Sequence, residues 1–153
     1  MSVDERMVHD IVQKVMANMQ ISGSVSGMHG VFKDMNDAIN ASIEAQKKVC
    51  TMTLDQREQI ISLIRKKTHE NAEILANMGV NETGMGNVGD KILKHHLTAD
   101  KVPGTEDIST IAWSGDRGLT LVEMGPFGVI GAITPATNPS ETVICNCIGM
   151  LAG

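Results

Sequence analysis

The sequence is poor in aromatic residues and carries no excess of positive charge. Its 153 residues contain two Phe, one Trp and no Tyr. Asp and Glu total 18 against 13 Lys and Arg, which gives a formal net charge of −5. Nucleic-acid-binding proteins need a basic stripe and often use aromatic rings for stacking. We therefore expect no nucleic-acid partner.

Long apolar runs and a disulfide framework are also missing. No apolar stretch reaches the roughly 18 residues that a membrane span needs, and charged residues interrupt the first turns of the chain, which excludes a secretory signal. The three cysteines, Cys50, Cys145 and Cys147, are an odd number at unremarkable spacing, so we expect packing residues in a reducing cytoplasm. The length and the 42% hydrophobic content fit about one globular domain with no membrane partner.

The clearest pattern that the sequence does contain is an amphipathic segment at residues 2–19. Apolar side chains recur there at helical spacing, and Ser2 and Glu5 have the spacing of a capping box. Residues 20–30 are rich in Gly and Ser and predict a flexible linker. A short helix on a linker must bury its apolar side elsewhere. Its own domain and a separate partner both remain open as docking surfaces.

Helical periodicity continues after the linker. The spacing predicts three helices: residues 34–49, a long helix with a capping box of Thr53 and Gln56 that ends at Gly79, and a helix from Asp90 to His96 or Ala99. Because His95 and His96 are adjacent, they lack the spacing of a helical metal pair. We expect them on a solvated helix face and expect no metal site.

Residues 84–89 form a literal G-x-G-x-x-G motif. This motif binds a dinucleotide only where it follows a strand and opens a helix. Here the preceding residues predict the end of a helix. We therefore expect residues 84–89 to be a flexible connection.

The C-terminal segment favours strands and turns and then one further helix. Residues 113–118 predict a turn and residues 119–124 alternate as in a strand, while residues 128–134 predict a strand buried on both faces of a parallel sheet. Asn138, Pro139 and Glu141 predict the cap, the first residue and the reciprocal capping partner of a helix that continues to about residue 151. Such a strand and helix without a following strand are half of a βαβ unit, so we expect a truncated chain.

The loop before this last helix is the strongest chemical candidate. Backbone amides of a loop that enters a helix, with Thr134, Thr137 and Asn138 beside them, can donate hydrogen bonds to an oxyanion or a cofactor. Ligands of α/β sheets also collect at the carboxyl ends of strands. A structural cap without a ligand is the alternative.

At this loop the sequence resembles a known family. Residues 118–151, GLTLVEMGPFGVIGAITPATNPSETVICNCIGML, resemble the coenzyme A-acylating aldehyde dehydrogenases, and the segments ETGMG, DKILKH, VPGTEDIS and AWSGDRGLT fit the same family. The resemblance implies an α/β, aldehyde dehydrogenase-like fold of which only the N-terminal part is present. That part would hold helices, an oligomerisation strand near residues 119–124, and the first strand and helix of a Rossmann-like NAD domain.

The resemblance also implies an activity. Members convert a short-chain aldehyde, here propionaldehyde or acetaldehyde, to acyl-CoA through a cysteine thioacyl intermediate, with NAD as cofactor and coenzyme A as co-substrate. None of the three cysteines matches the family's nucleophile motif, which lies beyond this chain. We therefore expect the 153 residues alone to be inactive.

The resemblance further assigns roles within the loop. The segment Ile133, Thr134, Pro135 and Ala136 would line the nicotinamide cofactor, and an Asn in the following loop would help to hold the oxyanion. An ungapped count places that Asn at Thr137, whereas the residue type favours Asn138. We prefer Asn138 and keep Thr137 as the second choice.

The N-terminal segment resembles the targeting peptides that load such enzymes into bacterial microcompartments. The chain would then divide into a targeting helix (1–19), a linker (20–30) and an incomplete NAD-binding domain (31–153). This implies a shell protein as partner of the 2–19 helix, a place inside a cytoplasmic microcompartment, and a homo-oligomer, dimer or tetramer, at full length. The alternative function is a non-catalytic targeting or interaction fragment that acts through the 2–19 helix. An independent nucleotide-binding domain is disfavoured because the second strand is missing.

Overall fold

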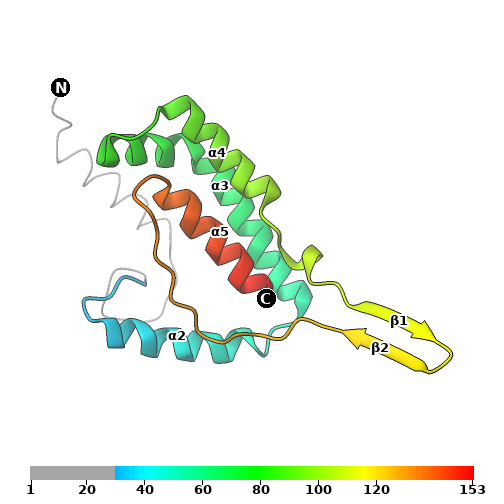
Figure 1. The fold of residues 1–153 in the computed structure, drawn as a ribbon. Helices are drawn as coiled ribbons and strands as arrows, with labels where there is room; N and C mark the ends of the chain where they lie inside the picture. The colour runs from blue at the N-terminus through cyan, green and yellow to red at the C-terminus, as the bar shows by residue number, and fades with distance from the viewer. Residues whose placement is uncertain (1–29) are drawn as a thin grey trace. The chain divides into compact units, whose positions relative to one another are not determined.

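The computed structural model describes residues 30–153 (Figure 1). The predicted 2–19 helix and residues 20–29 of the predicted linker lie outside the described residues. The chain divides into two compact units, Met1–Ala38 and Ile39–Gly153, and each is described by itself.

The described elements are mostly helical. In chain order they are α2 (Met35–Val49), α3 (Leu54–Thr83), α4 (Val88–Lys101), the short 3-10 turn η1 (Thr105–Asp107), the strands β1 (Ile111–Gly115) and β2 (Gly118–Val122), and α5 (Pro139–Ala152). The three predicted helices after residue 30 are therefore confirmed. The second and third extend further than expected.

The start of α3 follows the sequence prediction and its end does not. Gln56 N–H donates to Oγ1 of Thr53 at 3.2 Å, and Thr53 N–H donates to Oε1 of Gln56 at 3.0 Å, so the capping box is confirmed. The predicted end at Gly79 is wrong, because Gly84 (φ +66°) is the left-handed cap whose N–H donates to Val80 at 2.8 Å. Gly79 is buried inside α3, where a Cβ would contact the side chain of Lys91 at 3.8 Å.

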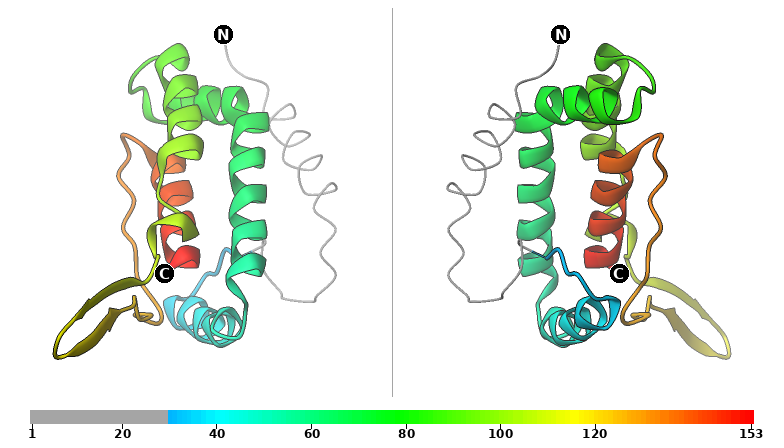
Figure 2. Two further views of the ribbon diagram at one scale, coloured as in Figure 1. Left: turned by 90° about the vertical axis from the view of Figure 1, so that its right-hand side faces the viewer. Right: turned by 90° about the vertical axis from the view of Figure 1, so that its left-hand side faces the viewer.

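The core lies where α3, α4 and α5 pack together (Figures 1 and 2). Ile61 of α3 and Ile148 of α5 are fully buried and meet Ala152, with four partly buried neighbours: Ile64, Val102, Ile144 and Leu151. Further along α3 the buried positions are Thr68, Ala72, Ala76 and Gly79. Such small side chains let a neighbouring helix approach closely.

Two arginines of α3 bind the C-terminal ends of the other helices. Arg57 Nη1 donates to the carbonyl of Ala152 at 2.7 Å, and Arg65 Nη1 and Nη2 donate to Ala99 at 2.7 Å and Val102 at 3.0 Å. Helix C-termini carry unpaired carbonyls and a partial negative charge. The arginines therefore fix where α4 and α5 end along α3.

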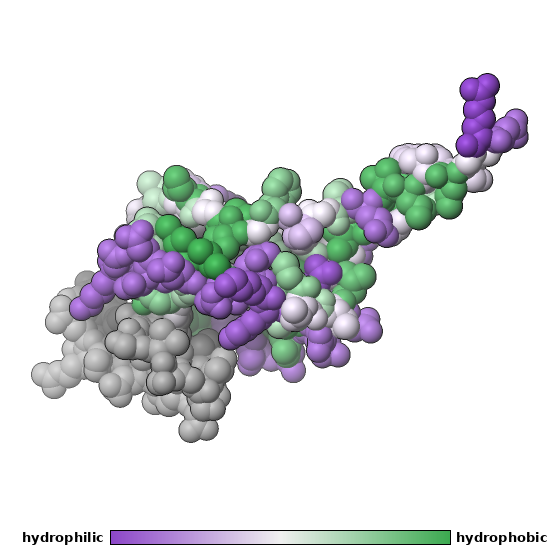
Figure 3. All heavy atoms as spheres, turned by 90° about the horizontal axis from the view of Figure 1, so that it is seen from below, coloured by the Kyte–Doolittle hydropathy of each residue, from purple (hydrophilic) through white to green (hydrophobic). Residues whose placement is uncertain are grey.

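The strands β1 and β2 form an antiparallel hairpin that extends away from the helices of its unit (Figures 1 and 2). Ile111 pairs with Val122 and Gly115 with Gly118, and every residue of both strands is exposed. Apolar residues lie along this arm and hydrophilic residues at its tip (Figure 3). The predicted strand at 119–124 is thus confirmed over 119–122, while residues 113–115, expected in a turn, belong to β1.

The predicted buried strand at residues 128–134 is not formed. These residues run along the surface without strand pairing, and all except Gly128 are exposed (Figure 1). A parallel strand needs a neighbour to accept and donate its backbone hydrogen bonds. Within residues 30–153 the only strands are β1 and β2, and they pair with each other. Among the described residues the apolar run therefore has no sheet to join.

Candidate functional site

The predicted chemical loop meets α4 at the start of α5. Lys91 Nζ donates to the carbonyl oxygen of Thr137 at 2.7 Å, and Lys94 Nζ donates to Oδ1 of Asn138 at 3.2 Å. Beside this corner lies an open hollow of about 450 Å³, lined by residues from the α3–α4 connection, α4 and the loop: Met85, Gly86, Asn87, Asp90, Lys91, Leu93, Lys94, Thr137 and Asn138. The structure thus brings Thr137 and Asn138 together with two ammonium groups.

The four predicted cofactor-lining residues lie on the exposed approach to this corner. Ile133 is 98% exposed, and Thr134, Pro135 and Ala136 are exposed as well. The backbone N–H groups of Ile133, Thr134 and Ala136 donate no hydrogen bond within residues 30–153, and Pro135 has no N–H. They do not line the hollow that Thr137 and Asn138 share. The N–H groups of Ile133, Thr134 and Ala136, without an acceptor among the described residues, nevertheless suit a ligand rich in acceptor oxygens.

Asn138 occupies the predicted position but not the predicted capping role. It is the N-cap residue of α5 and Pro139 follows it, as expected, yet its side chain makes no capping hydrogen bond. Its Oδ1 instead accepts from Lys94, and its Nδ2 lies 3.5 Å from Oγ1 of Thr137. The predicted reciprocal cap by Glu141 is wrong, because that carboxylate faces Lys91 and Ser140.

Several polar side chains behind the corner are buried, which was not predicted from the sequence. Lys91 and Glu141 are 3% and 6% exposed, and Lys91 Nζ lies 3.8 Å from Glu141 Oε1. His95 is fully buried: its Nδ1 contacts the Lys91 carbonyl at 2.7 Å and its Nε2 contacts Ser140 Oγ at 2.8 Å. The prediction of a solvated face is therefore wrong for His95. The i, i+3, i+4 spacing of Lys91, Lys94 and His95 is the signal that could have revealed this face.

The Gly-rich motif at residues 84–89 connects two helices. Gly84 ends α3, and Asn87 caps α4 by accepting from Asp90 N–H at 2.9 Å. A helix therefore precedes the motif, as the sequence predicts, and the strand that dinucleotide binding requires at this position is not there. Its glycines serve the turn, since Gly84 and Gly86 have φ of +66° and +77°.

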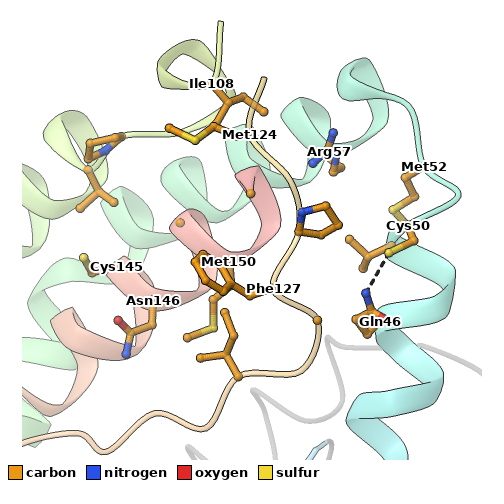
Figure 4. A pocket seen from close by; sticks show the side chains of 18 residues that line it. Gln46, Cys50, Met52, Arg57, Ile108, Met124, Phe127, Cys145, Asn146 and Met150 are labelled. Atoms are coloured by element: carbon orange, nitrogen blue, oxygen red, sulfur yellow. Dashed lines mark hydrogen bonds between the residues drawn. The ribbon is translucent and has the colours of Figure 1, made fainter. Parts of the chain in front are cut away.

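The three cysteines are exposed, so their predicted role as packing residues is wrong. Cys50 Sγ accepts from Gln46 Nε2 at 2.8 Å, and Cys50 and Cys145 lie on different sides of a second hollow of about 770 Å³ (Figure 4). Partial burial of the Cys147 thiol raises its pKa, which lowers its thiolate fraction at neutral pH. Although larger, this hollow is lined mostly by apolar side chains and lies apart from Thr137 and Asn138.

Two features are absent from the described part of the chain. Residues 30–153 hold no group of three or more His, Cys, Asp or Glu side chains arranged to bind a metal ion. No helix in the same range is long and apolar enough to cross a membrane.

Comparison with known proteins places this geometry in a family. Residues 13–153 match the model described as "Aldehyde dehydrogenase family". The chain belongs to the aldehyde dehydrogenase family.

Relatives within the family are CoA-acylating. The chain is 45% identical to the acetaldehyde dehydrogenase (acetylating) of Bilophila wadsworthia, over 97% of this chain and 32% of that protein. It is also 45% identical to the propanal dehydrogenase (CoA-propanoylating) of Salmonella typhimurium, over 80% of this chain and 26% of that protein. The chain thus spans about a third or less of the length of these relatives, and the resemblance seen in the sequence is confirmed.

Solved structures give the same result. The propionaldehyde dehydrogenase of the Clostridium phytofermentans fucose utilisation bacterial microcompartment is 77% identical, with a TM-score of 0.77 over 81% of this chain and 28% of that one. A Rhodopseudomonas palustris propionaldehyde dehydrogenase, solved with bound CoA and an acylated cysteine, is 48% identical, with a TM-score of 0.77 over 82% and 29% of the two chains.

Proposed function

We propose that this chain is the amino-terminal part of a CoA-acylating aldehyde dehydrogenase. The complete enzyme would convert propionaldehyde or acetaldehyde, CoA and NAD to the acyl-CoA and NADH. The observation that carries the proposal is the 77% identity to a propionaldehyde dehydrogenase of the same fold. All the relatives described above are enzymes, which speaks against a non-catalytic fragment that acts through the 2–19 helix.

Asn138 is our candidate for the residue that holds the oxyanion. When a cysteine thiolate adds to the aldehyde carbon, the C=O electron pair moves onto oxygen, and a fixed N–H donor stabilises that charge. Asn138 Nδ2 is such a donor: it has two N–H groups, of which one donates to Oγ1 of Thr137, and the bond from Lys94 to the amide oxygen orients the other. The hydroxyl of Thr137 is the second candidate. The nucleophilic cysteine would lie outside the 153 residues.

Ile133, Thr134, Pro135 and Ala136 would line the cofactor. NAD, when bound, accepts the hydride from the carbon that carries the thiol adduct. The backbone N–H groups of this exposed segment that have no acceptor among residues 30–153 fit a ligand with many acceptor oxygens. The segment itself would orient the cofactor and take no part in bond breaking.

Two assays test the proposed activity. Purified residues 1–153 should form no NADH from aldehyde and CoA, whereas a longer polypeptide that begins with these residues should form it only when CoA is present. In that longer protein, Asn138→Ala should lower kcat about 100-fold or more, as loss of an oxyanion donor does elsewhere. If Thr137→Ala has the larger effect, the oxyanion role moves to Thr137.

Residues 2–19 would direct the enzyme to a microcompartment shell protein, and the complete enzyme would be a homo-oligomer. The support is the source of the 77% identical relative, a bacterial microcompartment. Deletion of residues 1–20 should leave aldehyde oxidation intact and abolish co-purification with shells. Lost activity in the deletion variant would argue that the segment belongs to the catalytic fold.

A further inference from the structure

Two lysines on one side of α4 hold the corner at which α5 begins. Lys91 Nζ donates to the backbone carbonyl of Thr137, and Lys94 Nζ, one turn later, donates to the side-chain oxygen of Asn138. Residues three apart on a helix lie on the same side of it. One face of α4 therefore binds both residues that are candidates for holding the oxyanion.

Lys91 provides the fixed part of this arrangement. Its side chain is 4% exposed, and besides the Thr137 carbonyl it faces Glu141 of the first turn of α5. A buried ammonium group is stable only while its partners stay in place. The backbone at Thr137 is thus tied to α4 by a group that cannot readily move into water.

His95 connects α4 to α5 a second time. Its Nδ1 must donate to the Lys91 carbonyl, because a carbonyl oxygen only accepts. Its Nε2 contacts Oγ of Ser140, the second residue of α5, at 2.8 Å, and the same hydroxyl donates to Oε2 of Glu141 at 3.2 Å. The first turn of α5 is therefore fixed by side chains of α4.

Lys94 changes what the side chain of Asn138 can do. At an N-cap, an Asn side-chain oxygen ordinarily accepts from the amide of the second or third helical residue, here Ser140 or Glu141. In this structure Asn138 makes no such bond, and its oxygen accepts from Lys94 instead. The interaction with Lys94 thus competes with capping, and Nδ2 of the same amide donates to Oγ1 of Thr137 at 3.5 Å.

We propose that Lys91 and Lys94 are positioning residues for Asn138. Lys91 fixes the backbone at Thr137, and Lys94 holds the Asn138 oxygen, which orients the amide with Nδ2 toward Oγ1 of Thr137 instead of as a cap of α5. The second N–H of Nδ2 is then the donor for the oxyanion. This inference rests on the proposed acylating function for its consequence in catalysis. Its geometric part is independent of that function.

Amide hydrogen exchange on the 153-residue chain tests the geometric part. Lys94→Met removes an exposed ammonium group, so the fold should be kept, and Asn138 should then turn to cap α5. The amide of Ser140 or Glu141 should exchange about 5-fold more slowly, the equivalent of one capping hydrogen bond. Lys101→Met, on the same helix, is the matched control and should change neither amide. Unchanged exchange in Lys94→Met would overturn the proposal.

Kinetics of a longer polypeptide that begins with this chain test the catalytic part. Lys94→Met should lower kcat about 10-fold while the KM for CoA and for NAD stays within about 2-fold, because a misplaced donor weakens only the transition state. Lys94→Arg keeps a donor and should restore most of kcat. A wild-type kcat in Lys94→Met would overturn the positioning role and leave the proposed function intact. If the wild-type protein forms no NADH with CoA, the proposed function fails and the exchange result alone decides the geometry.

Discussion

Lys91 Nζ and Glu141 Oε1 lie 3.8 Å apart between α4 and α5, with side chains only 4% and 8% exposed. Glu141 Oε1 has no hydrogen-bond partner among the described residues, and the ammonium group of Lys91 is the cation that pairs with this oxygen. A buried ion pair is a weak source of net stability, but the loss of one partner leaves an uncompensated buried charge. This pair therefore makes the contact between α4 and α5 sensitive to single substitutions.

Lys91→Met should destabilise the fold strongly. It removes the hydrogen bond to Thr137 and leaves Glu141 buried without a counter-ion, a change that costs about 3 kcal/mol in comparable cases. Urea unfolding followed by circular dichroism measures the loss. The surface variant Lys101→Met should stay within about 0.5 kcal/mol of wild type.

The double variant Lys91→Met/Glu141→Leu tests whether removal of both charges restores the stability that is lost when only Lys91 is replaced. Replacement of both charges by apolar groups removes the unpaired carboxylate, so the double variant should be more stable than Lys91→Met alone. If the loss of stability in the double variant equals the sum of the losses in Lys91→Met and in Glu141→Leu, the charges are not coupled and the 3.8 Å contact has no energetic role.

Arg65→Met should uncouple the end of α4 from α3. Arg65 donates to the carbonyls of Ala99 and Val102 and lies 3.1 Å from Glu106, and hydrogen bonds from a charged donor typically contribute about 2 kcal/mol each when one partner is lost. A loss of about 2 kcal/mol or more in urea unfolding is the expected result. Lys66→Met removes only an exposed pair with Glu70 at 3.9 Å and should cost under about 0.5 kcal/mol. Equal losses of stability in Arg65→Met and Lys66→Met would contradict a role of Arg65 in holding the end of α4.

Glycine-to-alanine substitutions at two helix positions should change the free energy of unfolding in opposite directions. Gly84 has φ +66° at the C-cap of α3, so Gly84→Ala should cost about 1 kcal/mol, and Gly84→Asn less, because Asn tolerates this conformation. Gly149 lies within α5, where a Cβ would meet no atom within 4 Å, and Gly149→Ala should stabilise by about 0.5 kcal/mol. Differential scanning calorimetry of the two variants gives both signs directly.

Alkylation of Cys147 should be slow at mildly alkaline pH. Burial raises the pKa of this thiol, so at a given pH its thiolate fraction is smaller than that of a free thiol, and the thiolate is the nucleophile. The rate of reaction with iodoacetamide, followed by peptide mass spectrometry from pH 7 to 10, should reach half its maximum above the ordinary pKa of about 8.5. A half-maximum at or below about pH 8.5 would show that burial does not act on this sulfur.

Much of the local structure was predictable because its causes are local. The capping box of Thr53 and Gln56 and the start of α5 at Pro139 depend on side chains within a few positions of the backbone groups they affect. The family was also recognisable, because the motif around residues 134–144 is specific. These features need no knowledge of which elements pack together.

The errors arise where one element meets another. Residues 128–134 have the composition of a buried strand, yet a strand exists only with a neighbour to pair with. Gly79 has the features of a cap, but Lys91 of α4 packs against it, and the helix continues. The sequence predicts an exposed His95, but in the structure this side chain is buried against Ser140 of α5.

The candidate site shows the same division. The sequence by itself determined that Thr137 and Asn138 precede a helix in an acylating aldehyde dehydrogenase motif, because that information lies in adjacent residues. Only the tertiary structure decided that Lys91 and Lys94, more than forty positions earlier, bind those residues, and that Asn138 does not cap its own helix. The physical reason is competition: an amide oxygen takes the donor that packing brings closest, and packing is not a property of the local sequence.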